Sequence, residues 1–515
     1  MTDAQVLLRG GQVADGIGAT TRRADVLVDA HVIGAVEPGL PASPGCDVIT
    51  LAPGSVICPG FIDAHVHAEG PLLATGVVTG ALAQGVTTLV VGQDGQSWIG
   101  ATAATARYLN EYFGPVNGTL AAAGGLSAGG FRAAVAGRLV HNVAVLASQG
   151  TIRHNVAGLA QRPLDGVERA AARRQVEDAL AAGAVGLSSG FDYLPSRFGD
   201  TAEIASMAGP LAGAGRPYVS HLRGYGPKVT EGLAELVAVG RRAGVRVHAS
   251  HLWGAPADIE AACRDADAAG VGLSYDMYPQ RRSSTILASL LLPPEIQARG
   301  PAHTLAALTD PAERARLLAG EKFADGYLRH LYLGSLPGGL AEFAGLSLTQ
   351  AAAREGQPAG EWVLDLLVRA RLGVGAHLFR PQLSEDELAW INAGDRHCAG
   401  SDGIYQGQCP HPRGYAAFAL LAAQYVAGAP GTGYQVLARH LAATAAGVYG
   451  LRDRGRLAPG MAADICVIGP AGLAAHASYT APRRLATGVD LVLVNGVIVW
   501  RDGRQQAGFP GKLVS

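Results

Sequence analysis

The sequence predicts an α/β protein built on a (β/α)8 barrel of the TIM type, with a small β-sandwich domain formed by both termini and a helical insertion before the last barrel strand. Three observations favour this architecture. Both ends of the 515-residue chain carry strand patterns, the middle alternates strand patterns with helical ones, and polar residues follow most of the middle strands. Strands that alternate with helices are typical of a parallel sheet, and eight such units complete a closed barrel.

The two ends of the chain both consist of short apolar runs divided by glycine turns. The dipeptides "NG" and "DG" near the C-terminus are typical of hairpins. Neither end has enough strands to enclose a core alone, so we expect them to pair into one β-sandwich domain of residues 1–57 and 454–515. The strand patterns are "AQVLLRGGQVADG", "ADVLVDAHVIGAVEPG", "CDVITLAPG", "GMAADICVIG" and "DLVLVNGVIVWRDG".

The middle of the chain, residues 58–453, is the expected barrel. Alanine-rich amphipathic segments such as "VERAAARRQVEDALAAG" predict the helices between its strands. The gap between the seventh and eighth strands, about residues 285–394, carries helical patterns and predicts an insertion over the barrel mouth. The eight strand segments are "VICPGFIDAHVH", "VTTLVVGQDG", "NVAVLASQG", "AVGLSSGFD", "PYVSHLR", "VRVHASHLW", "VGLSYDMYP" and "HCAGSDG".

Composition excludes several classes of protein. The hydrophobic fraction is 49% and the charged fraction 16%, which allows a large core and argues against disorder. A net charge of -1 gives no long-range attraction to nucleic acid or to an anionic membrane, so we expect neither as a partner. The most apolar window, "YAAFALLAAQYVAGA", is shorter than the ~18 residues of a membrane span and predicts a buried helix.

Cysteine usage and the N-terminus bear on the compartment. The six cysteines are scattered without a CxxC pair, which indicates a reducing environment. The N-terminal segment shows no targeting pattern, and we therefore expect a cytoplasmic protein. The sequence leaves the oligomeric state open, a homo-oligomer included.

Two histidines stand one residue apart in "GFIDAHVHAEG". Side chains alternate along a strand, so His65 and His67 share one face, together with Asp63. Two imidazoles at the end of a strand can chelate one metal ion, because imidazole suits Zn, Fe, Ni and Mn. The alternative is a pair of structural histidines at a strand–loop junction.

Other polar residues follow other strands of the expected barrel. The carboxyl ends of parallel barrel strands meet at one rim, where the active sites of such barrels lie. Each residue alone has a structural explanation; Asp402 in "GSDG", for example, could cap a turn. Together they predict a metal centre composed of His65, His67, Asp94, His221, His251 and Asp402. His248 has the opposite parity to His251 and should face the helix layer, whereas Asp276 should play a supporting role.

A series of motifs runs along nearly the whole chain: "PGFIDAHVH", "GVTTLVVGQDG", "VGLSSGFDYLP", "SHLRGYG", "ASHLWG", "YDMYP", "AGSDG", "HPRGY" and "RGRLAPGMAADICVIGP". In this order they resemble the amidohydrolase superfamily and, within it, the N-acyl-D-amino-acid deacylases (D-aminoacylases). The resemblance implies a metal-dependent hydrolase that cleaves the amide bond of an N-acyl amino acid, with the D enantiomer expected.

The resemblance also implies roles for the candidate ligands. His65 and His67 would bind one ion, His221 and His251 a second, and Asp402 would act as the general acid/base. Asp94 stands in "GQDG", where the family has a bridging cysteine in "GNCG", and no lysine lies near "AVGLSSG" to bridge instead. We therefore expect Zn²⁺, as one or two ions, with Mn²⁺ or Fe²⁺ as competitors because a carboxylate is a harder ligand than a thiolate.

The family binds the substrate carboxylate with a lysine, a tyrosine and a serine. Tyr278 and Ser284 match the last two, whereas Trp253 occupies the position of the lysine. A guanidinium can hold a carboxylate through two hydrogen bonds, so any of three arginines could supply the missing charge, which are Arg223, Arg281 and Arg282. The alternative for Arg281 and Arg282 is a solvated loop. Trp253 could form a wall for an apolar acyl group.

Two alternatives remain at this stage. One is an amidohydrolase that acts on a cyclic amide, in the manner of a hydantoinase or a dihydroorotase, or on another small amide. The other is a catalytically silent homologue that serves as a binding protein, which the retention of four histidines and Asp402 argues against.

Overall fold

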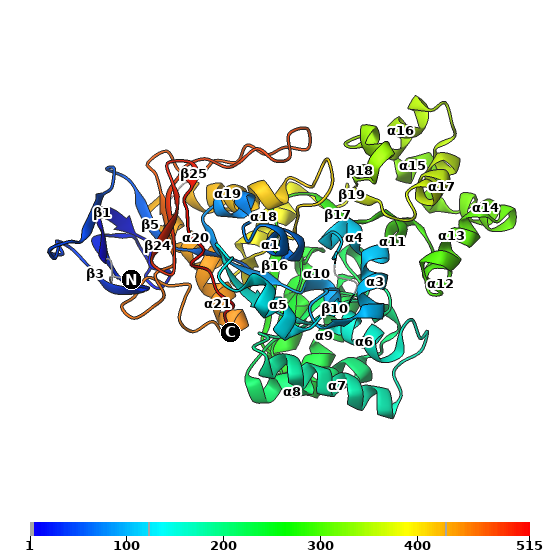
Figure 1. Cartoon of the computed structure of the whole chain (residues 1–515), viewed down its shortest axis with the longest axis horizontal. Helices are drawn as coiled ribbons and strands as arrows, with labels where there is room; N and C mark the ends of the chain where they lie inside the picture. The colour runs from blue at the N-terminus through cyan, green and yellow to red at the C-terminus, as the bar shows by residue number, and fades with distance from the viewer. Residues whose placement is uncertain (1–4, 122–123, 428–429) are drawn as a thin grey trace.

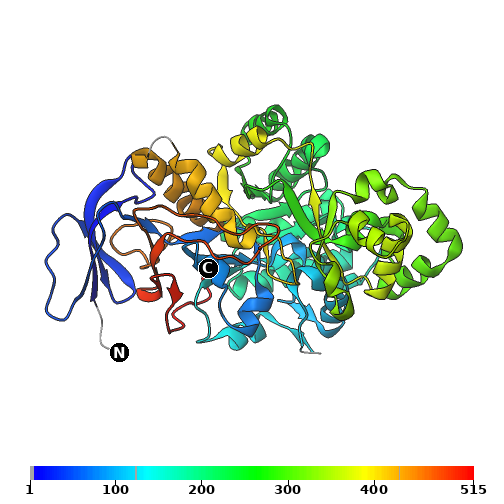
Figure 2. The same cartoon turned by 90° about the horizontal axis from the view of Figure 1, so that it is seen from above.

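The computed structural model describes residues 5–121, 124–427 and 430–515, and it has a mixed α/β fold. A sheet built from both ends of the chain lies at one end of the molecule, and a group of short helices lies at the other (Figures 1 and 2). Parallel strands surrounded by helices occupy the space between them. Within the described ranges, every helix is too short or too polar to traverse a bilayer.

The terminal sheet joins the two ends of the chain directly. β5 pairs in parallel with β1 and antiparallel with β22, so the N-terminal strands and the C-terminal strands adjoin in one sheet. The predicted "NG" and "DG" turns join β23 to β24 and β24 to β25. The nine strands are β1 (Gln5–Val13), β2 (Arg22–Asp29), β3 (Val32–Glu37), β4 (Asp47–Thr50), β5 (Val56–Pro59), β22 (Ile465–Ile468), β23 (Val489–Val494), β24 (Val497–Arg501) and β25 (Arg504–Gln505).

Each of the eight strand segments predicted for the middle of the chain contains a strand. The first segment is divided, because β5 belongs to the terminal sheet and only the residues after Gly60 join the central strands. All pairs between the central strands are parallel. They are β6 (Phe61–Asp63), β7 (Val66–His67), β8 (Val86–Val91), β11 (Asn142–Val145), β12 (Ala147–Ser148), β13 (Leu187–Gly190), β14 (Tyr218–His221), β15 (Val247–Ala249), β16 (Leu273–Met277), β20 (His397–Ala399) and β21 (Gly403–Ile404).

Backbone hydrogen bonds connect these strands further. The amide of Leu146 donates to the carbonyl of Val91 at 2.9 Å, which ties the segment after β11 to β8. The amide of Ala64 donates to the carbonyl of Ala399 at 3.0 Å, which ties the first central strand to the last. Apolar side chains from several strands then form one buried cluster, which includes Ile62, Val90, Ala144, Val219, Cys398 and Tyr449.

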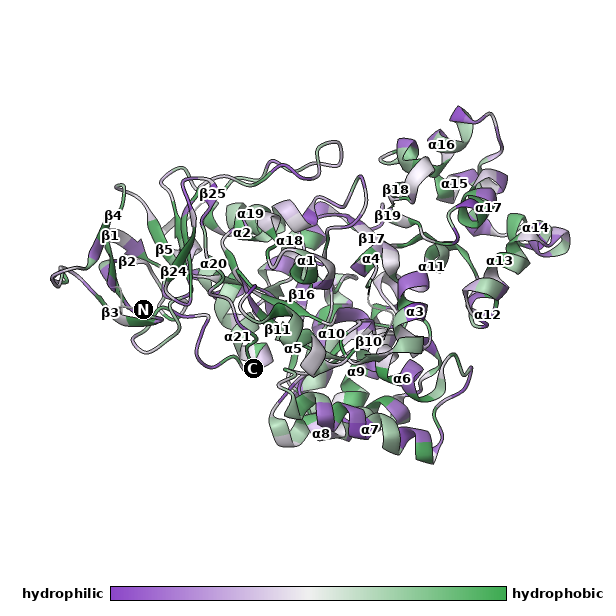
Figure 3. Cartoon of the chain, viewed as in Figure 1, coloured by the Kyte–Doolittle hydropathy of each residue, from purple (hydrophilic) through white to green (hydrophobic). Residues whose placement is uncertain are grey.

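Helices follow most of the central strands, as the alternation predicted. The outer helix α7 carries hydrophilic residues on its exposed surface (Figure 3). Its N-terminus has a capping box in which Asp165 and Glu168 exchange side-chain to backbone hydrogen bonds. The main helices are α1 (Glu69–Ala74), α2 (Thr79–Leu82), α3 (Ala103–Tyr112), α4 (Gly114–Asn117), α5 (Ala128–Val135), α6 (Gln149–Ala157), α7 (Gly166–Ala181), α8 (Thr201–Ala214), α9 (Val229–Ala243), α10 (Pro256–Ala268), α18 (Glu385–Ala393), α19 (Arg413–Val426), α20 (Pro430–Ala438) and α21 (Thr444–Tyr449).

α19 contains most of the window "YAAFALLAAQYVAGA", and its apolar residues are largely buried, as predicted. Residues 428–429 of that window lie outside the described ranges.

The segment between β16 and β20 is mainly helical, as predicted, but it also holds a three-stranded antiparallel sheet that the sequence did not predict. Its order is β17–β19–β18. The buried core of this segment continues onto Tyr108 and Phe113, around α3 and α4. Its elements are β17 (Arg282–Ile286), α11 (Leu287–Leu291), α12 (Pro294–Gln297), α13 (Pro301–Thr309), α14 (Pro311–Leu318), α15 (Asp325–Leu328), β18 (Leu331–Ser335), α16 (Leu348–Arg354), α17 (Ala359–Arg369) and β19 (Gly375–Phe379).

Candidate metal centre and pocket

Four imidazoles from three strand ends surround the carboxylate of Asp94. Its Oδ1 faces Nε2 of His65 at 3.6 Å and Nε2 of His251 at 3.8 Å. Its Oδ2 faces Nε2 of His67 and Nδ1 of His221, both at 3.6 Å. Each oxygen of Asp94 is therefore shared between two histidines, and five of the candidate ligands form one cluster.

The sixth candidate ligand, Asp402, faces the same Nε2 atoms of His65 and His67. Its Oδ1 is 3.4 Å from Nε2 of His67 and 3.7 Å from Nε2 of His65. Its Oδ2 forms a buried ion pair with Nη1 of Arg413 at 2.7 Å. Burial alone would raise the pKa of Asp402, but Arg413 and the nearby imidazoles hold it below its ordinary value. Asp402 is therefore ionised, with one oxygen facing the histidines.

Three of these residues adopt left-handed backbone conformations that side chains other than glycine rarely tolerate. The φ angles of Asp94, His251 and Asp402 are 56°, 36° and 48°. Such conformations persist where the surrounding structure enforces them, and they gather at functional sites. A glycine makes room for Asp94, since a Cβ on Gly190 would lie 2.3 Å from the carbonyl oxygen of Asp94.

A buried carboxylate, Asp276, supports two of the histidines. Its Oδ2 lies 3.4 Å from Nδ1 of His65 and 3.0 Å from Nε2 of His248. Its Oδ1 accepts a hydrogen bond of 2.9 Å from the backbone amide of His251. A carboxylate on the outer nitrogen of a histidine fixes the tautomer that leaves the other nitrogen free for an ion. The supporting role expected of Asp276 agrees with this geometry.

The expected orientation of His248 is wrong. Its side chain is fully buried against Asp276 instead of facing the helices. Strand alternation fails here because β15 ends at Ala249 and the backbone of His251 is left-handed. The alternation of side chains along a strand therefore cannot be extended from His251 to predict the orientation of His248.

Asp63 fastens the segment that carries the histidine pair to the loop that carries Asp402. It accepts hydrogen bonds from the Ser401 amide at 2.8 Å and from the Ser401 hydroxyl at 2.5 Å. The amide of His65 also donates to it, at 3.3 Å. Burial raises the pKa of Asp63 to about 7. This contact holds the first and last central strands in register at the site.

The donor atoms fit a divalent cation. In a tetrahedral zinc site with bonds of about 2.0–2.1 Å, neighbouring ligand atoms lie about 3.4 Å apart, close to the 3.4–3.8 Å found between these histidines and carboxylates. Nε2 of His65, Oδ1 of Asp94 and Nδ1 of His221 are buried and have no hydrogen-bond partner among the described residues. Two groups, His65–His67–Asp402 and His65–Asp94–His251, each bring their ligand atoms within 4.8 Å of one another.

The electrostatics of the cluster also favour positive charge. Burial alone would lower the pKa of His67, but Asp402 and Asp94 raise it to about 10. The pKa of His221 likewise rises to about 10 against burial, because of Asp94 and Asp192. A field that draws protons onto buried imidazoles also draws a divalent cation, which competes with those protons.

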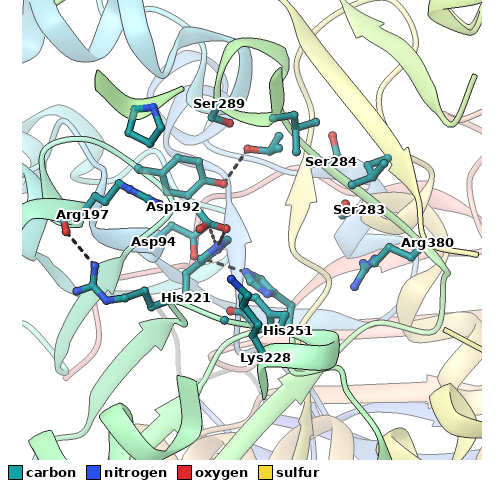
Figure 4. Close-up of a pocket in the computed structure, with 18 of the residues that line it drawn as sticks. Asp94, Asp192, Arg197, His221, Lys228, His251, Ser283, Ser284, Ser289 and Arg380 are labelled. Carbon is teal, nitrogen blue, oxygen red and sulfur yellow. Dashed lines mark hydrogen bonds and ion pairs between the residues drawn. The ribbon is translucent and has the colours of Figure 1, made fainter. Parts of the chain in front are cut away.

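The cluster opens into a cavity of about 430 Å³, a volume suited to a small molecule (Figure 4). His65 and His67 lie behind its surface and are almost fully buried. The other predicted residues that line it are Asp94, His221, Arg223, His251, Trp253, Tyr278, Ser284 and Asp402.

The three arginines predicted to supply positive charge to the substrate site differ in position and in pairing. Arg281 and Arg282 lie outside this cavity and line a different one, where Arg282 stacks over Tyr332 and Tyr479 at 3.8 and 3.9 Å. Arg223 lines the cavity, but its Nε forms an ion pair with Glu235 at 3.0 Å and its other nitrogens donate to backbone carbonyls. Its charge is therefore already neutralised.

Sequence reasoning missed five charged residues of the cavity, which are Asp192, Arg197, Lys228, Lys322 and Arg380. Two of them make contacts that bear on the site. Asp192 forms an ion pair with Nε2 of His221 at 3.0 Å, and it could have been found in the motif "VGLSSGFDYLP". Arg380 follows β19 and also lines the cavity. No motif surrounds Arg380, and only the pairing of β19 with β17 brings it to the site.

The chain is similar to known proteins over nearly its full length. A model of the amidohydrolase family matches residues 306–500. The N-acyl-D-glutamate deacylase of Alcaligenes xylosoxydans xylosoxydans is 32% identical over 507 residues, which cover 96% of this chain and 93% of that protein.

Solved structures show the same likeness. The N-acyl-D-glutamate deacylase of Bordetella bronchiseptica, solved with zinc and a phosphonate inhibitor that mimics the tetrahedral intermediate, superimposes with a TM-score of 0.82 at 28% identity and covers 99% of both chains. A D-hydantoinase from Thermus sp. covers 99% of this chain and 98% of its own, with a TM-score of 0.57 and 16% identity, which shows a common fold alone.

Proposed function

The chain belongs to the N-acyl-D-amino-acid deacylase family of amidohydrolases, and from that premise we propose that it hydrolyses the amide bond of an N-acyl-D-amino acid. One observation carries this proposal. Four imidazoles and two carboxylates converge at one cavity, at separations that suit divalent ions. The substrate is a small molecule, consistent with the size of the cavity.

We propose Zn²⁺ as the cofactor, with Mn²⁺ or Fe²⁺ as competitors. His65, His67 and Asp402 would hold one ion, His221 and His251 a second, and Asp94 would be shared between them. Bound zinc lowers the pKa of a water molecule from 15.7 to about 7 and polarises a carbonyl group.

Asp402 is the proposed general base and general acid. Arg413 engages its Oδ2, so Oδ1, which faces His65 and His67, is the oxygen available to a proton. In this proposal it takes the proton of the attacking water and returns it to the leaving amide nitrogen. General acid–base catalysis of this kind contributes roughly 10²–10⁴-fold to the rate.

Tyr278, Ser284 and Trp253 are the proposed contacts of the substrate. Tyr278 and Ser284 line the side of the cavity supplied by β16 and β17, and Trp253 lies half-buried beside them. Trp253 presents an aromatic face to the acyl group or to the amino-acid side chain. Arg223, held by Glu235, is proposed to fix the loop after β14 instead of meeting the substrate.

We further propose that the central strands close into a (β/α)8 barrel and that residues about 285–394 form an insertion on it. The parallel pairings, together with the Leu146–Val91 and Ala64–Ala399 hydrogen bonds, support closure with eight strand positions. The sheet shared by both termini supports a separate domain of residues 1–57 and 454–515, extended to Pro59 by β5. Six free cysteines are consistent with the proposed cytoplasmic location.

Two measurements test the function. Elemental analysis of the purified protein should find zinc or a related divalent metal. A panel of N-acetyl and N-formyl D- and L-amino acids, assayed beside hydantoins, should show release of the free D-amino acid, with an Asp402→Asn preparation as the control for contaminating activity. Turnover of the hydantoins alone would favour the cyclic-amide alternative, and a protein with neither metal nor turnover would be a silent homologue.

A further inference from the structure

We propose that Arg380, supplied by the insertion, binds the α-carboxylate of the substrate. This inference rests on the proposed deacylase function, because it assigns a ligand to the same cavity. It places a carboxylate-binding site on a residue that lies outside every motif of the sequence.

Arg380 is a buried cation without an anion. Its side chain is part of a residue only 4% exposed, and its Nε is buried without a hydrogen-bond partner. Its Nη2 donates to the hydroxyl of Tyr278 at 2.5 Å. Among the residues that the structure describes, no carboxylate forms an ion pair with it. Burying an unpaired charge costs free energy, so an anionic ligand bound beside this guanidinium would offset that cost.

The other cations of the cavity do not share this combination of burial and isolation. Arg223 has Glu235 as its partner. Lys228 and Lys322 are exposed, as is Arg197, so water can solvate all three. Arg380 is therefore the cation whose environment a bound carboxylate would change most.

Its position suits the α-carboxylate. Two guanidinium groups lie near the ring of Tyr278, with Arg413 at 4.5 Å and Arg380 at 5.7 Å from its centroid. Arg413 is paired with Asp402, the proposed general acid/base, and Arg380 donates to the hydroxyl of the same tyrosine, so contacts through Tyr278 connect Arg380 to the reacting end of the cavity. In an N-acyl amino acid the carboxylate carbon lies roughly 3–4 Å from the amide carbon, since only the nitrogen and Cα separate them.

Neighbouring residues fix the position of Arg380 at the cavity. The ring of Trp253 lies 5.1 Å from its guanidinium, which gives the cation an apolar flank. β19 pairs with β17, so Arg380 and Ser284 reach the cavity from neighbouring strands of one small sheet. Figure 4 shows Arg380 beside Ser283 and Ser284, across the cavity from Asp192 and Arg197.

The test uses two isomeric substrates with the zinc-loaded full-length enzyme. N-acetyl-D-glutamine carries an α-carboxylate and a side-chain amide, whereas N-acetyl-D-isoglutamine carries an α-amide and a side-chain carboxylate. Wild-type enzyme should prefer the first by about 100-fold in kcat/KM, as expected for losing hydrogen bonds to a charged group. Arg380→Met should lower kcat/KM for N-acetyl-D-glutamine by about 100-fold and leave that for the isomer nearly unchanged.

Three further proteins complete the design. Arg282→Met is the matched control, since the side chain of that arginine stacks on Tyr332 and Tyr479 at a different cavity, and the substitution should leave both values unchanged. Trp253→Lys in the Arg380→Met background places an ammonium beside the vacated position and should recover about tenfold of the lost kcat/KM for N-acetyl-D-glutamine. Arg380→Lys keeps the charge and should retain most of the preference even if Arg380→Met folds poorly, which thermal melting and zinc content would reveal.

The possible failures are distinct. Wild-type enzyme that hydrolyses no N-acyl-D-amino acid would overturn the proposed function itself. Wild-type turnover of N-acetyl-D-glutamine that survives in folded Arg380→Met would overturn the role of Arg380 alone. Equal losses of kcat/KM for both isomers in Arg380→Met would also overturn the assignment. A loss confined to N-acetyl-D-isoglutamine would overturn it too, because that result would place the side-chain carboxylate, and not the α-carboxylate, at Arg380.

Discussion

Replacing Asp276 by asparagine should weaken zinc binding although Asp276 is not a proposed ligand. One oxygen of this carboxylate faces both His65 and His248, and the other accepts the backbone amide of His251. An asparagine that kept the bond from the His251 amide would turn its NH₂ group toward the two imidazoles. Nδ1 of His65 would then lose the carboxylate oxygen that faces it at 3.4 Å, and the tautomer that frees Nε2 for the ion would no longer be favoured.

The size of the effect follows from these contacts. Burial alone would raise the pKa of Asp276, but His65 and His248 hold it far below its ordinary value, so a full negative charge is lost. A hydrogen bond to a charged group contributes about 1.5–3 kcal/mol, and loss of such partners of metal ligands costs about 10–100-fold in metal affinity or activity. We therefore expect the zinc dissociation constant of Asp276→Asn to rise by about 10–100-fold.

Competition with a chelator of known affinity measures that constant without any assay of turnover. Ser274→Ala is the matched control, because it removes only the hydroxyl that contacts Nδ1 of His248 at 2.8 Å and leaves Asp276 in place. It should change the constant by less than about threefold. If folded Asp276→Asn bound zinc as tightly as wild type, the supporting role derived for this carboxylate would be refuted.

Three further predictions follow from the same site and fold. Asp402→Asn should lower kcat by about 10²–10⁴-fold while elemental analysis still finds zinc, because His65, His67 and Asp94 remain; unimpaired turnover would remove Asp402 from the mechanism. Dialysis against a chelator should abolish hydrolysis and added Zn²⁺ should restore it, so a chelated enzyme of full activity would contradict the metal centre. Asp165→Ala should cost about 1 kcal/mol of folding stability, seen as a lower Tm with unchanged kcat/KM, because it removes the N-cap of α7 far from the cavity.

The site was predictable where it depends on strand periodicity. His65, His67 and His221 lie on or beside regular strands, and simple alternation places their side chains on one face. Asp94, His251 and Asp402 were found only because each follows a strand, since their left-handed φ angles escape any periodic rule. The same irregularity made the prediction for His248 wrong.

Contacts that depend on the folding of the insertion were not predictable. Helices in that segment follow from its amphipathic patterns, but the sheet β17–β19–β18 includes a pair, β17 and β19, whose partners are far apart in sequence, as Arg282 and Phe379 are. Register over such a distance is set by tertiary packing, which no local pattern reports. Arg281 and Arg282 were therefore the arginines close to Tyr278 in sequence, whereas Arg380 is the arginine that donates a hydrogen bond to its hydroxyl.

At Asp94 and at Trp253 this chain departs from the motifs it resembles. In both cases the charge that the family residue would carry is present in the site, although at Trp253 a different residue carries it. The resemblance implies a thiolate where Asp94 stands, and a carboxylate keeps the negative charge between the four histidines. It also implies an ammonium where Trp253 stands, and under our proposal the guanidinium of Arg380, 5.1 Å from that indole, restores the positive charge. Amide hydrolysis needs these charges at fixed positions around the substrate, and the strand or loop that carries each charge does not matter. Loss of a motif residue therefore argues against an activity only when no other side chain brings the same charge to the same place.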